Sequence, residues 1–273
     1  MTAIERPTPA QRTRRLAVLA AAVFAVIVPL VQMLGGFGLS QAEFAADGNE
    51  TLRVAGYAFS IWSLIYLGIL SYAGRQALPQ TGESVLINRM GWPSAVAFFG
   101  IGFWIVMAAM NLKAASVLVI FAALLALLLP MLASARAIRA TGAMERDRWF
   151  VIWPLAALAG WLTVAAPLNL ITVATAFEAL PAALSPTGWA VAAVVVTTLV
   201  GIGVTWALRT MAYPLPIAWG LVGAFVAEQE IKPVLAFTAL AAAFVLVVAG
   251  VIVTFGLRRR RTPVRADRRV GEG

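Results

Sequence analysis

Long runs of apolar residues separated by short polar segments dominate the chain. Eight such stretches are present, at about 16–36, 54–73, 92–110, 114–133, 150–171, 189–208, 214–227 and 233–257. A helix that crosses a bilayer needs about 20 mostly apolar residues, so the pattern predicts an all-α, polytopic integral membrane bundle of about eight transmembrane helices. The seventh stretch opens with Pro214 and Pro216 and is shorter than that length.

Basic residues fall mainly on one side of the predicted membrane. If the N-terminus is cytoplasmic and all eight stretches span, every Lys and Arg except Arg53, Lys113 and Lys232 lies in a cytoplasmic segment. This asymmetry is typical of cytoplasmic-membrane proteins. We therefore expect a multi-pass protein of the bacterial cytoplasmic (inner) membrane with both termini cytoplasmic. Without the seventh span, the Arg-rich tail would lie outside.

Composition narrows the possible functions. Of the 273 residues, 62% are hydrophobic and 12% are charged, whereas soluble domains carry about 25% charged residues. The chain contains no cysteine and no histidine, the commonest metal ligands and general bases, so we expect neither a metal site nor catalytic residues. The run 258–261 in the basic tail is expected to contact anionic lipids. Nucleic-acid binding is not expected, because no aromatic-interleaved basic surface accompanies it.

Aromatic residues within the spans are the candidate chemistry. Two stripes are formed by Phe59, Trp62 and Tyr66 on the second predicted helix and by Trp161, Ala165 and Asn169 on the fifth. At about 100° per residue, the first stripe covers about 60° of its helix and the second about 80°. A large ring beside a small residue leaves room for a flat ligand, and ordinary helix packing also explains such a stripe.

These stripes carry a family resemblance. The run 59–66, with Phe59, Trp62 and Tyr66, resembles the second-helix signature of the TspO/MBR family of tryptophan-rich sensory and translocator proteins. The run 161–169 is similar to the family's fifth-helix pattern, Trp-x-x-x-Ala-x-x-Leu-Asn, and Trp104 to the Trp of its third-helix element. Two features depart from the family: Ile101 replaces an Asn, and a polar loop over 39–53 replaces a Pro-rich segment.

The resemblance implies a five-helix TspO/MBR-like domain over 1–171, a three-helix membrane extension over 172–257, and the basic cytoplasmic tail 258–273. It implies a sensory or tetrapyrrole-handling role, no resident cofactor, and a homodimer, which is frequent in the family. The implied binding cavity for a porphyrin or similar hydrophobic small molecule would be lined by Phe59, Trp62, Tyr66, Trp104, Trp161, Ala165 and Asn169.

Other functions stay open from the residues alone. Eight helices suit a membrane transporter of a neutral or amphipathic small metabolite, although the Trp62-x-x-x-Tyr66 pattern has no counterpart after residue 189 that would indicate a repeat. Light-dependent porphyrin degradation is the one enzymatic route left, because the usual acid–base groups are missing. The segment 70–75 also matches a cholesterol-type pattern, which is a weak one.

Overall fold

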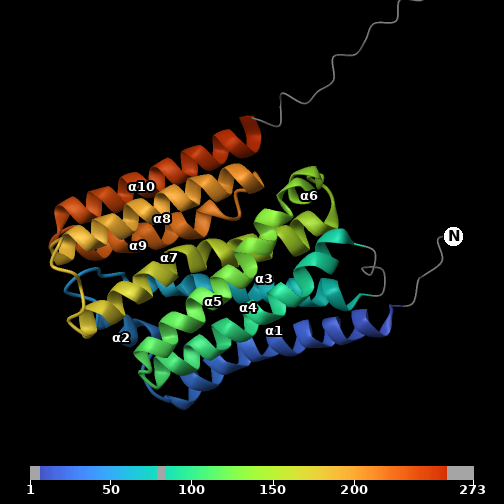
Figure 1. The fold of residues 1–273 in the computed structure, drawn as a ribbon, viewed down its shortest axis with the longest axis horizontal. Coiled ribbons are helices and arrows are strands. Elements are labelled where there is room, and N and C mark those ends of the chain that lie inside the picture. The colour runs from blue at the N-terminus through green and yellow to red at the C-terminus, as the bar shows by residue number, and fades with distance from the viewer. Residues whose placement is uncertain (1–6, 79–83, 257–273) are drawn as a thin grey trace, which may run out of the picture.

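The computed structural model describes residues 7–78 and 84–256, and every regular element within these ranges is helical. Each predicted apolar stretch corresponds to one helix (Figure 1): α1 (Pro9–Gly35), α3 (Ile61–Ala77), α4 (Val85–Ala109), α5 (Lys113–Ala133), α7 (Trp153–Ala176), α8 (Pro186–Leu208), α9 (Pro214–Glu228) and α10 (Pro233–Val251). Shorter elements are α2 (Gln41–Ala46), α6 (Ala135–Ala140), the 3-10 turn η1 (Gly56–Ser60), and the π-helical turns η3 (Arg148–Ile152) and η4 (Ile252–Gly256). The predicted all-α membrane bundle is confirmed.

Polar caps, rather than the apolar runs, set where several helices begin. At α1, the Thr8 side chain accepts a hydrogen bond from the backbone N–H of Gln11, and the Gln11 side chain accepts one from the backbone N–H of Thr8. This capping box satisfies two N–H groups that the first turn leaves unpaired. At α8, Ser185 caps a helix whose first residue is Pro186, a position where a missing N–H costs nothing. Both helices therefore start before their apolar cores.

Within the described residues, seven helices are long and apolar enough to cross a membrane, and α9 is the exception. Its 15 residues span about 22 Å, less than the roughly 30 Å of a hydrocarbon core. Residues 210–213, which precede α9, are buried and non-helical. The Tyr213 carbonyl lies so close to α7 that a Cβ on Gly160 would be 2.1 Å from its oxygen. Irregular backbone is tolerated in a membrane bundle where protein buries it in this way.

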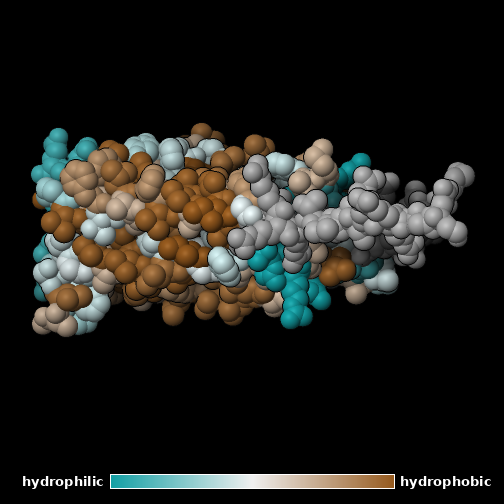
Figure 2. Space-filling view, turned by 90° about the horizontal axis from the view of Figure 1, so that it is seen from above, coloured by the Kyte–Doolittle hydropathy of each residue, from teal (hydrophilic) through white to brown (hydrophobic). Residues whose placement is uncertain are grey.

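The central helix of the bundle is α7. It packs against α3 and α5 on one side and against α8 and α9 on the other. Helices α8, α9 and α10 lie together, and α1 lies at the opposite edge (Figure 1). In the span Arg148–Ala176, which contains α7, 67% of an 18-residue apolar stretch is buried, against 28% of the corresponding stretch in α1. Figure 2 shows hydrophobic residues over the middle of one face and hydrophilic ones toward its ends, as expected for a molecule that crosses a bilayer.

The direction of each long helix can be followed along the chain. In Figure 1, the start of α1 and the end of α10 lie at the same end of the molecule, and α8 runs parallel to α10 because α9 returns the chain between them. The helix ends therefore alternate as an eight-crossing chain requires. The assignment of that end to the cytoplasm stays a prediction.

Candidate functional site

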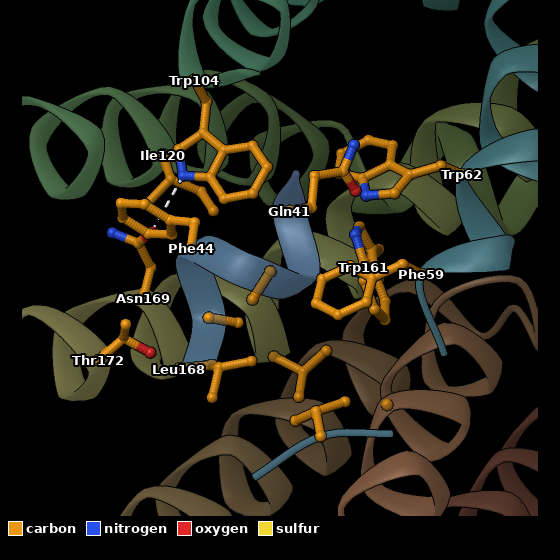
Figure 3. Close-up of a pocket in the computed structure, with 15 residues that line it drawn as sticks. Gln41, Phe44, Phe59, Trp62, Trp104, Ile120, Trp161, Leu168, Asn169 and Thr172 are labelled. Atoms are coloured by element: carbon orange, nitrogen blue, oxygen red, sulfur yellow. Dashed lines mark hydrogen bonds between the residues drawn. The ribbon is translucent and has the colours of Figure 1, made fainter. Parts of the chain in front are cut away.

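Six of the seven residues named from the sequence line one cavity, which is bordered by η1 and by helices α2, α3, α4, α5, α7 and α9 (Figure 3). They are Phe59, Trp62, Trp104, Trp161, Ala165 and Asn169. The seventh, Tyr66, does not line the cavity but stacks on Trp62, with ring centroids 5.4 Å apart and planes inclined by 21°. The structure thus brings both predicted stripes together, and their role in ligand binding stays a prediction.

Trp62 is the centre of an aromatic cluster. Its ring lies 6.5 Å from that of Trp104, nearly parallel to it, and 6.1 Å from that of Trp161, which meets it edge-on. Phe44 of α2 packs edge-on against Trp104 at 6.3 Å. All four rings are buried. Three different helices therefore each supply one indole ring to the cavity wall.

Asn169 holds Trp104 in place. The Trp104 indole Nε1–H donates to Oδ1 of Asn169 over 3.1 Å, and Nδ2 of Asn169 donates to the Ser116 hydroxyl over 3.0 Å. The Ser116 hydroxyl lies 2.7 Å from the carbonyl oxygen of Lys113. The sequence suggested a direct contact between Asn169 and a ligand, whereas here protein groups engage both ends of its amide. Its observed role is to orient an indole.

Two other indoles have no such partner. The Nε1 atoms of Trp62 and Trp161 are buried and make no hydrogen bond within the described ranges 7–78 and 84–256, and the same holds for Oγ1 of Thr172. All three residues line the cavity. Buried indole N–H groups usually find an acceptor, and leaving a buried donor unpaired costs about 1–3 kcal/mol. Two residues of the cavity lining therefore carry unpaired donors, and an acceptor that reached these donors would satisfy them.

The cavity itself is small. Its volume is about 40 Å³, well below the volume of most small-molecule sites. A groove of about 670 Å³ lies beside it, lined by α1, α2 and the start of α3. Gln41, Phe59 and Trp62 line both spaces, and Tyr66 lines the groove. Trp62 therefore stands between a small inner cavity and a groove within the usual range for small-molecule sites, about 300–1,000 Å³.

Sequence reasoning missed the walls that α2 and α9 supply. Gln41 and Phe44 lie on α2, in a segment interpreted as a polar loop. A signal was present, because Ser40 and Glu43 form a capping box that begins α2. The hydrogen bonds from Ser40 also lower the pKa of the Glu43 carboxyl. On α9, Gly220 lies so close to α7 that an added Cβ would be 3.0 Å from Val164.

The cholesterol-type segment does not present its aromatic residue to the lipid. Tyr72 is fully buried, and its hydroxyl lies 2.9 Å from that of Ser94. Arg75 is paired with Asp147 at 2.9 Å. A sterol on the outer surface of α3 would therefore not reach Tyr72.

The fold and the site define a membrane-embedded helical bundle with an indole-lined cavity. The model of the family described as TSPO-like protein matches residues 14–252, and the chain belongs to this family. The matched range begins in α1 and ends in η4, so it includes α8, α9 and α10. The resemblance found in the sequence is thereby confirmed. No curated protein and no solved structure matches the chain.

Proposed function

We propose that this chain binds a flat, hydrophobic ligand of the porphyrin or tetrapyrrole class and serves in sensing or handling it. The observation that carries the proposal is the pair of buried, unpaired indole N–H groups of Trp62 and Trp161 in an otherwise apolar, aromatic site. A tetrapyrrole offers a flat π face for stacking and nitrogen or oxygen acceptors that these donors can bind.

The volumes indicate where such a ligand would rest. The inner cavity of about 40 Å³ is too small for it, whereas the groove of about 670 Å³ is not. We infer that the ligand lies in the groove against the stacked rings of Trp62 and Tyr66. A small movement of the Trp62 ring would then open the inner cavity and bring the ligand edge within reach of Trp161.

That the protein lies in a lipid bilayer follows from the family and from the seven helices that are long and apolar enough to cross it. A homodimer and a cytoplasmic location of both termini belong to the proposal. Axial ligation of a haem iron is not part of it. The sequence has no histidine or cysteine, which are the commonest axial ligands. The groove is lined by Met33 and Tyr66, which are weaker ligands.

The test is a titration of the purified chain in lipid nanodiscs with a metal-free porphyrin. Saturable quenching of tryptophan fluorescence together with a shifted porphyrin absorption band is the expected result. A chain that leaves the porphyrin spectrum unchanged, and instead moves a small solute into liposomes, would contradict the proposal and favour the transporter alternative.

A further inference from the structure

One side of the cavity is covered by a segment that we call the lid, residues 40–55. It contributes Gln41, Phe44, Ala45 and Val54 to the cavity lining. At its centre, Gly48 lies directly on α7, where an added Cβ would be 2.9 Å from the Cα of Thr172. A larger side chain would lift the lid at this point. Thr172 lies beneath the lid and is only 1% exposed.

The turn between α9 and α10 holds the far end of the lid. The Lys232 ammonium group donates to three consecutive lid carbonyls, those of residues 49, 50 and 51, at 3.4, 2.6 and 3.1 Å. Glu228, which is fully buried, accepts a hydrogen bond from the backbone N–H of Arg53 at 2.7 Å and lies 3.5 Å from Nζ of Lys232. Hydrogen bonds that involve a charged group are roughly twice as strong as neutral ones.

A second lysine holds the lid from the other side. Lys113, the first residue of α5, forms an ion pair with Asp47 at 2.9 Å. The sequence contains no lysine other than Lys113 and Lys232. Both therefore fix the same segment, one from the five-helix part and one from the C-terminal helices. Asp47 is 40% exposed at its side chain, so solvent weakens the Lys113 pair more than the sheltered Lys232 contacts.

We propose that Lys232 is a positioning residue that latches the lid, so that the α9–α10 turn controls how often the cavity opens. The three C-terminal helices then have a defined task, which is to regulate access to a site formed mainly by the first five. The latch rests on contacts within the chain. Its consequence for ligand exchange rests on the proposed function, because residues 40–43 of the lid also line the groove in which we place the ligand.

A single cysteine measures the opening of the lid without any ligand. Thr172→Cys provides a unique thiol, because the chain has no cysteine. The substitution breaks no hydrogen bond in the described part of the chain, because the Thr172 hydroxyl has no partner there. In nanodiscs, adding Lys232→Met should accelerate the reaction of this thiol with N-ethylmaleimide by about tenfold or more, the factor expected from losing one hydrogen bond to a charged group. Lys232→Arg, which keeps the charge, should give an intermediate rate.

Glu230→Gln is the matched control. Glu230 is an exposed charged residue of the same turn, and among the described residues it makes no hydrogen bond or ion pair with the lid. The Glu230→Gln rate should equal that of the Thr172→Cys parent. Equal labelling rates for Lys232→Met and Glu230→Gln would overturn the latch. If Lys232→Met does not yield a folded protein, the labelling rate of Lys232→Arg is the test. A rate equal to that of the Thr172→Cys parent would then overturn the latch.

The same proteins separate the latch from the proposed function. Lys232→Met should increase the rate constants for association and dissociation of a metal-free porphyrin by a larger factor than it changes the dissociation constant. Faster labelling in a chain that binds no porphyrin would leave the latch standing and refute the proposed function. Faster labelling with unchanged porphyrin kinetics would refute control of access by the latch.

Discussion

Trp104→Phe and Trp161→Phe remove the same atoms from two buried rings of one cavity, yet they should affect stability differently. Trp104→Phe removes the donor that pairs with Oδ1 of Asn169 at 3.1 Å. Trp161→Phe removes a buried donor that has no partner among the residues that the structure describes. Losing a partner of a buried polar group costs about 1–3 kcal/mol, and removing an unpaired donor recovers a similar amount. The Ser116 hydroxyl lies 3.4 Å from the same Oδ1 and can still donate to it. The loss of stability in Trp104→Phe is therefore expected toward the lower end of this range.

The expected difference in unfolding free energy between the two variants is therefore at least about 2 kcal/mol, with Trp104→Phe the less stable. Because the ring atoms removed are the same, the cost of the vacated space largely cancels in the comparison. Reversible unfolding in mixed detergent micelles, titrated with a denaturing detergent, measures this difference in unfolding free energy in the absence of ligand. Equal loss of stability in both variants would mean that the Trp161 N–H is already satisfied in the free protein. The argument that it awaits a ligand would then fail.

Three further predictions follow from the same structure. A single cysteine at Glu230 should react with an impermeant maleimide in intact cells, and one at Met144 only after permeabilisation; the reverse pattern would invert the topology. A haem and its metal-free porphyrin should bind within about tenfold of each other, because the usual axial ligands are missing, and a hundredfold preference for haem in a parallel titration would reveal an axial ligand. Gly160→Ala should lower the unfolding free energy by about 1–3 kcal/mol through overpacking against Tyr213, whereas Gly74→Ala, which meets no atom within 4 Å, should not, when both are compared by thermal unfolding.

The helices could be predicted from the sequence because burial in lipid imposes a long, unmixed apolar run on each span. The helix ends could not, since local caps such as Thr8 and Ser185 set them. The short helix α2 was missed for a related reason. Its six residues carry no readable periodicity, and only the Ser40–Glu43 capping box indicates it. Residues 210–213 lie in a buried turn that no local pattern in the chain indicates.

The site was predictable where one helix carries it and not where several helices meet. The two stripes follow from helical spacing, although Phe59 lies on η1 and not on α3. The structure places all their residues except Tyr66 on one cavity. The partner of Asn169 could not be inferred, because Trp104 and Ser116 lie on other helices. The contribution of α9 through Gly220 was missed because a glycine that permits close packing has no side chain to suggest a role.

The measurement that tests the central claim most directly is the porphyrin dissociation constant of Trp62→Leu beside that of Trp206→Leu. Trp62 contacts three aromatic rings and borders both the cavity and the groove, whereas Trp206 is 58% exposed on α8. Stacking on an aromatic side chain is worth about 1–3 kcal/mol in nucleic-acid sites. Trp62→Leu should therefore bind the porphyrin roughly 5- to 150-fold more weakly than the unmodified chain, and Trp206→Leu should bind it unchanged. Equal affinities for the two variants would contradict the claim that the indole cluster is the ligand site.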